Sequence, residues 1–267
     1  MPIRFYAPAA EHPGDVVDLP RDEAQQLVRV LRLKVGVAVR IFNGRGAEFA
    51  AVVAMTSKDG ARVRVEESRA TVPEARVAVT LAQAVLRGDK MDDVVRDAVM
   101  MGVAAIQPLV TDRTEIALAA LERSHRRERW QRIAVSSSKQ CGRAVVPPVL
   151  EPRTFRDATA ALLDVRPQAT PETAQGIAPG IALEQTPPGL MCVEPAASTD
   201  ALSLGDLNAT PPPAVTILIG PEGGWTAEEI TAGSAACRLV TLGPRTLRAD
   251  AMALIALTAL FSRWREI

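Results

Sequence analysis

The most constraining feature of the sequence is an apolar strand that runs through a glycine-rich turn directly into a helix, at 217–226 (ILIGPEGGWT). Thr226 and Glu229 have the spacing of a capping box, which predicts that the helix begins at Thr226. Glycines after a strand let a ligand approach the backbone closely, so the turn is a candidate binding loop. The alternative is a tight strand–helix connection without a ligand. No P-loop or dinucleotide fingerprint is present, because neither spacing occurs.

A second segment of strand, turn and helix follows at 239–261 (LVTLGPRTLRADAMALIALTALF). Its helix, expected at 251–261, is apolar almost all round, so it must be buried within its own chain or at a subunit interface. The two turns define a crevice of the kind in which open α/β sheets bind ligands. A candidate third loop is 190–195 (LMCVEP), where Glu194 is either a ribose acceptor or simply a strand-end carboxylate.

The periodicity of the remaining chain indicates two domains, 1–71 and 75–267. The first is expected to be a compact β domain with a hairpin at Asn43-Gly44 and one helix at 22–31. Its expected strands lie at 37–43, 48–55 and 61–66. In the second, strands alternate with helices, which predicts a mostly parallel sheet with helices on both faces. Its expected strands lie at 77–86, 104–110, 190–193, 215–219 and 239–242, with earlier helices at 89–101 and 122–134.

Composition narrows the class of protein. A net charge of zero argues against a simple polycation, although residues 110–153 are basic and residues 154–242 acidic. Three cysteines and two histidines argue against a metal cluster and a disulfide framework. No apolar run reaches membrane-spanning length and the N-terminus lacks a signal pattern, so we expect a cytoplasmic protein without a metal. Prolines concentrate in 164–213, where 168–185 and 203–213 are expected to be long loops.

The phrases IGPEGGWTAEEI and LGPRTLRADAMALIALTAL resemble the signature of the SPOUT class of methyltransferases. Within that class they are most similar to RsmE-type enzymes, which methylate N3 of a uridine in 16S ribosomal RNA of the small subunit. The blocks LVRVLRLKVG and FNGRGAEFAAVV look like the PUA-like RNA-binding β-barrel of that family. The resemblance implies a trefoil-knotted parallel sheet after the PUA-like domain, a homodimer, and S-adenosylmethionine as cofactor.

The resemblance also implies functional residues. The cofactor would lie bent among the three loops, held largely by backbone groups of Val193, Glu194, Ile219, Gly220, Pro221, Glu222, Gly223, Gly224, Leu242, Gly243, Leu247 and Arg248. Ribosomal RNA would be contacted by Arg4, Arg29, Arg32, Lys34, Gln140 and Arg143. Arg248 and Arg143 are the candidates for a cation that favours the N3 anion of uracil. The alternative for both is a phosphate contact or a structural salt bridge.

Three departures from the family pattern concern substrate contacts more than the fold. The family usually has a lysine and a glutamate in the helix that here reads RDAVMMG at 96–102. It often has Glu-Gln at 139–140 and Glu-Thr-Ala at 250–252, where this chain has Lys-Gln and Asp-Ala-Met. Two alternatives therefore stay open: methylation of another RNA position, and a catalytically impaired RNA-binding assembly protein. An oxidoreductase is disfavoured because the dinucleotide fingerprint is absent.

Overall fold

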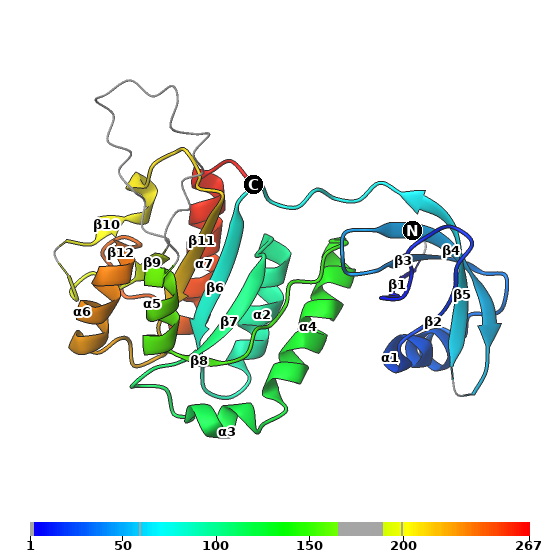
Figure 1. Ribbon diagram of the computed structural model, residues 1–267, viewed down its shortest axis with the longest axis horizontal. Coiled ribbons are helices and arrows are strands. Elements are labelled where there is room, and N and C mark those ends of the chain that lie inside the picture. The colour runs from blue at the N-terminus through cyan, green and yellow to red at the C-terminus, as the bar shows by residue number, and fades with distance from the viewer. Residues whose placement is uncertain (1–2, 59, 165–188, 199) are drawn as a thin grey trace. The chain divides into compact units, whose positions relative to one another are not determined.

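The computed structural model describes residues 3–58, 60–164, 189–198 and 200–267 (Figure 1). Its contacts divide the chain into two units. The first unit comprises Met1–Glu74 together with Gln131–Pro148, and the second comprises Ala75–Trp130 together with Val149–Ile267. The sequence places residues 131–148 in the second domain, whereas their contacts are with the N-terminal residues.

The first unit is built on a five-stranded sheet with the order β1-β3-β4-β5-β2. The strands are β1 (Arg4–Tyr6), β2 (Val16–Asp18), β3 (Ala38–Phe42), β4 (Glu48–Thr56) and β5 (Ala61–Arg69). Strand β1 pairs with β3 in parallel, and all other pairs are antiparallel. The predicted hairpin joins β3 to β4, where the Asn43 side-chain oxygen accepts from the amides of Arg45 and Ala47. The strands and the hairpin expected for this region are confirmed.

The helix expected at 22–31 forms as α1 (Arg21–Gln25), which continues into a π-helical turn, η1 (Gln26–Val30). Leu27 from this turn is fully buried in the same core as Phe5 and Ile41 of the sheet. Burial of this apolar face holds the short helix, because so few residues are marginal as an isolated helix.

The second unit is built on a seven-stranded sheet with the order β10-β12-β9-β11-β6-β7-β8. The strands are β6 (Ala78–Ala84), β7 (Ala105–Val110), β8 (Arg153–Thr154), β9 (Gly189–Cys192), β10 (Leu202–Ser203), β11 (Ala214–Ile219) and β12 (Cys237–Thr241). Every neighbouring pair is parallel, so all carboxyl ends meet at one edge. The expected parallel sheet, with helices on both faces (Figure 1), is confirmed. The threading of the chain into a knot stays a prediction.

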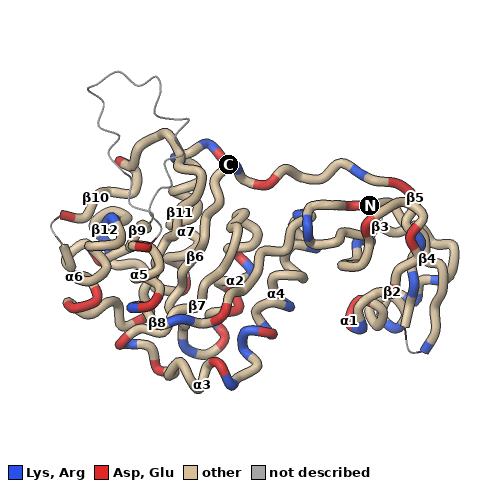
Figure 2. The backbone as a smooth tube through the Cα atoms, in the orientation of Figure 1, with Lys and Arg blue, Asp and Glu red and all other residues tan. Residues whose placement is uncertain are grey.

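The helices are α2 (Lys90–Met101), α3 (Leu118–Glu122), α4 (Arg126–Cys141), α5 (Phe155–Asp164), α6 (Ala227–Ala236) and α7 (Ala249–Arg263). Helix α2 ends as predicted at Gly102, whose φ is +102°. The helix expected at 122–134 is wrong in its bounds, because two helices occupy this region. The Ser124 hydroxyl donates to the Leu121 carbonyl and so ends α3 before α4 begins. Figure 2 shows the arginines along α4.

Helix α7 packs against α2 and carries the apolar sequence noted above. Ala256, Leu257 and Leu260 are buried within the chain. Leu254 and Ile255 are exposed, so the helix is not covered on all sides by its own chain. The expected loop at 203–213 contains one 3-10 turn, η3 (Leu204–Asp206), and the loop expected at 168–185 lies outside the described residues.

No helix among the residues described combines the length and apolar character that crossing a membrane requires.

Candidate functional site

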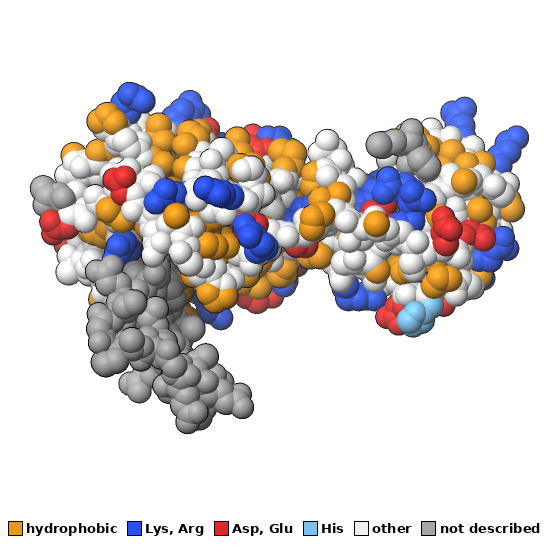
Figure 3. All heavy atoms as spheres, turned by 90° about the horizontal axis from the view of Figure 1, so that it is seen from above, with side chains coloured by type: hydrophobic (Ala, Val, Ile, Leu, Met, Phe, Trp, Pro, Cys, Tyr) orange, Lys and Arg blue, Asp and Glu red, His pale blue; other side chains and the backbone are white. Residues whose placement is uncertain are grey.

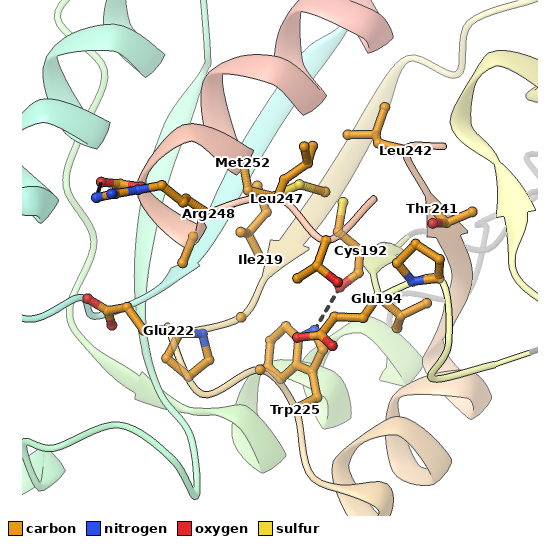
Figure 4. A pocket seen from close by; sticks show the side chains of 18 of the residues that line it. Cys192, Glu194, Ile219, Glu222, Trp225, Thr241, Leu242, Leu247, Arg248 and Met252 are labelled. Carbon is orange, nitrogen blue, oxygen red and sulfur yellow. Dashed lines mark hydrogen bonds and ion pairs between the residues drawn. The ribbon is translucent and has the colours of Figure 1, made fainter. Parts of the chain in front are cut away.

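Three neighbouring strands of the second unit end beside a single cavity. Strand β9 lies between β11 and β12, so the ends at Cys192, Ile219 and Thr241 are adjacent at one edge. The cavity there has a volume of about 440 Å³ (Figure 4). This volume lies within the usual range for small-molecule sites, and the carboxyl edge is where open α/β sheets place them.

The cavity is lined by residues from all three of the loops expected to bind a cofactor. Ten of the twelve predicted residues line it, namely Val193, Glu194, Ile219, Gly220, Pro221, Glu222, Gly224, Leu242, Leu247 and Arg248. Gly223 and Gly243 do not line it, and both are exposed. A cofactor contact by either glycine stays a prediction.

Trp225 fixes the shape of the glycine turn. Its indole N–H donates to the Cys192 carbonyl at 2.7 Å, which ties the loop after β11 to the end of β9. A Cβ on Gly220 would lie 3.1 Å from the Trp225 ring, so a side chain there would displace the indole. Glycine at 220 therefore lets the indole pack directly against the turn, beside the cavity.

Gly224 has a φ of +68°, a left-handed conformation that glycine adopts without strain. Its amide donates to the Pro221 carbonyl at 2.9 Å and closes the turn. A Cβ on Gly224 would lie 3.0 Å from a carboxylate oxygen of Glu194. The backbone conformation thus favours glycine at this position, and any side chain here would also press on the Glu194 carboxylate.

The helix after the turn begins as predicted. The Thr226 hydroxyl accepts from the Glu229 amide, and the Glu229 carboxylate accepts from the Thr226 amide at 3.0 Å. The second carboxylate oxygen of Glu229 accepts from the Asp112 amide at 3.0 Å. Glu229, which is buried, therefore joins the start of α6 to the loop after β7.

Arg248 stands just before α7, at the rim of the cavity. Its guanidinium donates to both carboxylate oxygens of Asp250, at 3.0 and 2.7 Å, and its side chain is 76% exposed. The bond from Arg248 lowers the pKa of Asp250 to about 2, and the same bond raises the pKa of Arg248. Figure 4 shows the Arg248 side chain on the same side of the cavity as Glu222, away from Thr241.

Burial keeps the thiol of the cysteine in the cavity wall protonated. Cys192 is buried, and burial raises the pKa of its thiol to about 12. The thiol is therefore protonated at neutral pH and is a poor nucleophile. Among the described residues, no group of three or more His, Cys, Asp and Glu side chains is placed to hold a metal ion.

Comparison with protein families decides the class of this site. The model of the RNA methyltransferase domain matches residues 73–261, and the model of the RNA methyltransferase PUA domain matches residues 19–66. The chain belongs to the RNA methyltransferase family. The resemblance found in the sequence motifs is thereby confirmed.

Relatives of this RNA methyltransferase are named ribosomal RNA small subunit methyltransferase E. The relative from Synechocystis sp. is 30% identical over 90% of this chain and 71% of its own length. The relative from Rickettsia conorii is 26% identical over 95% of this chain and 93% of its own.

A solved structure of such an enzyme from Neisseria gonorrhoeae, bound to S-adenosyl methionine, is 32% identical with a TM-score of 0.80. The match covers 99% of this chain and 98% of that one.

Sequence motifs did not identify several residues that line the methyltransferase cavity. Trp225 and Thr241 adjoin predicted residues and were within reach of the same argument. Lys90 could not be predicted in this way. It is the first residue of α2, and it lies at the cavity because β6, the strand before α2, pairs with β11. Its ammonium donates to Glu222 at 2.8 Å. Partial burial opposes ionisation of Glu222, but the bonds from Lys90 and from the Arg87 amide lower its pKa.

Arg143 and Arg4, both predicted to act on RNA, lie in the first unit of the methyltransferase, where Arg143 is buried and Arg4 is partly buried. The Arg143 Nε donates to the Glu74 carboxylate at 3.0 Å, and its side chain is 8% exposed. Arg4 donates to Glu48 at 2.9 Å and to the carbonyls of Ser138 and Arg143, both at 2.8 Å. Arg4 thus caps the C-terminal end of α4. The geometry gives both arginines structural contacts, and their roles toward RNA stay predictions.

The other four predicted RNA-binding residues are exposed: Arg29, Arg32, Lys34 and Gln140. Arg32 has a positive φ of 51° at the end of the helical turn. Their exposure leaves them accessible to a ligand.

Proposed function

We propose that this protein transfers a methyl group from S-adenosylmethionine to N3 of a uridine in 16S ribosomal RNA of the small subunit. The observation that carries the proposal is the single cavity lined by three strand-end loops in a chain of the RNA methyltransferase family. The names of the relatives and the cofactor held by the Neisseria gonorrhoeae structure supply the substrate and the methyl donor.

The residues present fit this cofactor. The Thr241 hydroxyl is buried at the cavity wall without a hydrogen-bond partner among the described residues, so a polar ligand group would satisfy it. Gly220 and Gly224 leave room for Trp225 and Glu194, two side chains that shape the wall of the cavity. We propose that the twelve residues predicted from the sequence hold the cofactor, chiefly through backbone groups, with Glu194 accepting from its ribose.

The cofactor supplies an activated methyl group, so the protein acts mainly by positioning the reacting atoms. Such positioning can lower a barrier by about 7–11 kcal/mol. We propose that Arg248 also favours the N3 anion of uracil, because a cation stabilises a nearby developing negative charge. Its side chain is 76% exposed at the rim, so the guanidinium can reach a base there, either together with Asp250 or after leaving it.

We propose the same catalytic role for Arg143, although its guanidinium is already paired with Glu74. The guanidinium must leave Glu74, or act while bound to it, before it can favour an anion. Arg248 has no such obstacle, so it is the first residue to test.

We propose that residues 1–71 form the RNA-binding domain and that residues 75–267 form the catalytic domain. Arg29, Arg32, Lys34 and Gln140 are exposed and suited to phosphate or base contacts. Arg4 and Arg143 would act on RNA indirectly, by holding the residues around them in place, unless RNA binding breaks their ion pairs.

We propose that the protein works as a homodimer in the cytoplasm, without a metal or a membrane partner. Exposed apolar side chains at Met100 on α2 and at Leu254 and Ile255 on α7 support the dimer, because these two helices pack together. Figure 3 shows one face of the molecule, on which hydrophobic side chains gather over the second unit. The cytoplasm is the site of the proposed substrate.

The test is mass-spectrometric mapping of 16S rRNA nucleosides from a strain that lacks the gene. The proposal expects one N3-methyluridine to be absent and to return with the intact gene but not with an Arg248→Ala variant. A methyl group missing from another nucleotide would support the alternative RNA position. An unchanged set of modifications would contradict methylation of this RNA and favour the impaired assembly protein.

A further inference from the structure

A second cavity of the same unit lies at the carboxyl ends of β6 and β7, near α3 in Figure 1. Its volume is about 300 Å³. Arg87 comes from the loop after β6, Arg113 and Glu115 come from the loop after β7, and Arg126 begins α4. Three arginines from three separate segments therefore face one space.

The second cavity adjoins the first along the same sheet edge. Strand β11 pairs with β6 in parallel, so the loops that follow them are neighbours. Glu222 lines both cavities and accepts from the Lys90 ammonium at 2.8 Å and the Arg87 amide at 3.2 Å. In the sheet, β7 and β8 lie on one side of β6, and the later strands β9 to β12 lie on its other side. The two cavities thus flank the point where strand order reverses, where such sheets bind ligands.

The charges of the second cavity favour an anion. Its carboxylates are Glu222, already held by Lys90, and Glu115. The Glu115 carboxylate lies 3.0 Å from the Arg87 Nε as an ion pair, but both side chains are more than 60% exposed, so the pair is weak. The Arg113 Nη1 donates to the Gly223 carbonyl at 2.5 Å and has further donors to offer.

Arg126 is the most available of the three cations. Within the described residues its guanidinium makes no hydrogen bond or ion pair, whereas Arg127 beside it pairs with Glu151 at 3.1 Å. A cation in the first turn of a helix is also disfavoured by the helix dipole. Helix stability therefore does not account for arginine at 126, and a bound anion would.

We propose that the second cavity binds a phosphate group of the RNA strand next to the base that enters the first cavity, an inference that rests on the proposed function. Arg126 is the principal ligand, Arg113 and Arg87 support it, and Glu115 competes with the phosphate for Arg87. Arginine suits this role because its planar fork donates two parallel hydrogen bonds to phosphate oxygens. The phosphate contact sets where the strand lies, and so delivers the neighbouring base to the methyl donor.

The first test compares Arg126→Ala with Arg156→Ala in the full-length protein. Arg156 is an exposed arginine on α5 outside both cavities, so both variants lose one surface charge. With unmethylated 16S rRNA as probe, Arg126→Ala raises KM about tenfold and leaves kcat unchanged. It also lowers the slope of log affinity against log salt by about 0.7–0.9, the value for one phosphate contact. Arg156→Ala leaves both quantities as in the wild type.

The second test has the opposite sign. Glu115→Gln removes the competing carboxylate and tightens RNA binding about two- to threefold, with an unchanged affinity for S-adenosylmethionine. An Arg126→Ala variant with wild-type KM and salt slope overturns the inference. So does an Arg126→Ala variant that loses affinity for S-adenosylmethionine, because the cavity would then serve the cofactor's carboxylate. A wild-type protein that methylates no rRNA refutes the proposed function itself, which is a distinct result.

Discussion

Two regions of the molecule place functional-looking residues in opposite environments. In the second unit, the cavity at the sheet edge is lined by glycine turns and carries an exposed cation, Arg248. In the first unit, the buried Glu48 carboxylate pairs with the partly buried Arg4 and Arg40, and the buried Arg143 pairs with Glu74. Open backbone and an available charge suit ligand binding, whereas a charge paired in the interior is committed to its partner, because leaving it unpaired there is strongly destabilising.

Residue type alone therefore does not distinguish an RNA contact from a structural salt bridge. Arg143 and Arg248 were predicted for the same chemistry, yet their side chains are 8% and 76% exposed. The partner and its burial decide which role is open in the structure.

The largest expected effect is at the glycine turn. Gly224→Val places a branched side chain at a φ of +68° and against Glu194, so we expect no detectable binding of S-adenosylmethionine by calorimetry. The matched control is Gly36→Val, where φ is +86° but a Cβ would meet nothing within 4 Å. It carries the backbone strain without the clash and should retain the cofactor. If both variants bind normally, the cavity does not depend on its open backbone.

The second prediction concerns the buried Glu48 carboxylate. Glu48→Ala leaves Arg4, which is 10% exposed, and the partly exposed Arg40 without their shared carboxylate, so the free energy of unfolding should fall by about 3–5 kcal/mol, measured with denaturant. Glu66→Ala is the control, because Glu66 pairs with Arg64 at the surface and should change stability by less than about 1 kcal/mol. Equal effects of the two substitutions would remove the distinction between the two regions.

The third prediction separates the two arginines. Arg248→Ala should lower kcat about 100-fold, as loss of one electrostatic stabiliser typically does, while cofactor affinity and stability are kept. Arg143→Ala should instead lower the free energy of unfolding, because it leaves Glu74 without its partner. Single-turnover methylation and denaturant unfolding of both variants measure this. Wild-type turnover by Arg248→Ala would rule out its catalytic role.

The smallest effect is the titration of Asp250. Its folded pKa of about 2 lies below the value of about 3.9 for an unperturbed aspartate. The stabilisation is therefore present above pH about 4 and is lost as the pH falls through about 2. Carboxyl NMR shifts should show this midpoint, which should move up toward 3.9 in Arg248→Ala. A midpoint that does not respond to Arg248→Ala would mean that the pair does not form in solution.

Local sequence signals predicted the parts of the fold that depend on neighbouring residues. Three features could be predicted because each depends on residues close in sequence. They are the capping box at Thr226, the end of α2 at Gly102 and the hairpin at Asn43. The three strand-end loops followed from the same signals and from the family motifs.

The features that sequence reasoning missed depend on distant contacts. Lys90 enters the first cavity only because β6 pairs with β11, more than 120 residues later in the chain. The ion pair of Arg143 joins residues 69 positions apart, and no spacing rule links them. The single helix expected at 122–134 was wrong in its bounds, because the Ser124 hydroxyl bonds the Leu121 carbonyl and ends α3 before α4 begins.

We propose that the backbone turns at three strand ends together bind one methyl donor. Amide hydrogen exchange with and without S-adenosylmethionine tests it most directly. The account predicts one saturable site per chain, with slowed exchange concentrated in 192–195, 219–225 and 241–248. Protection confined to other segments, or no protection at saturating cofactor, would contradict it.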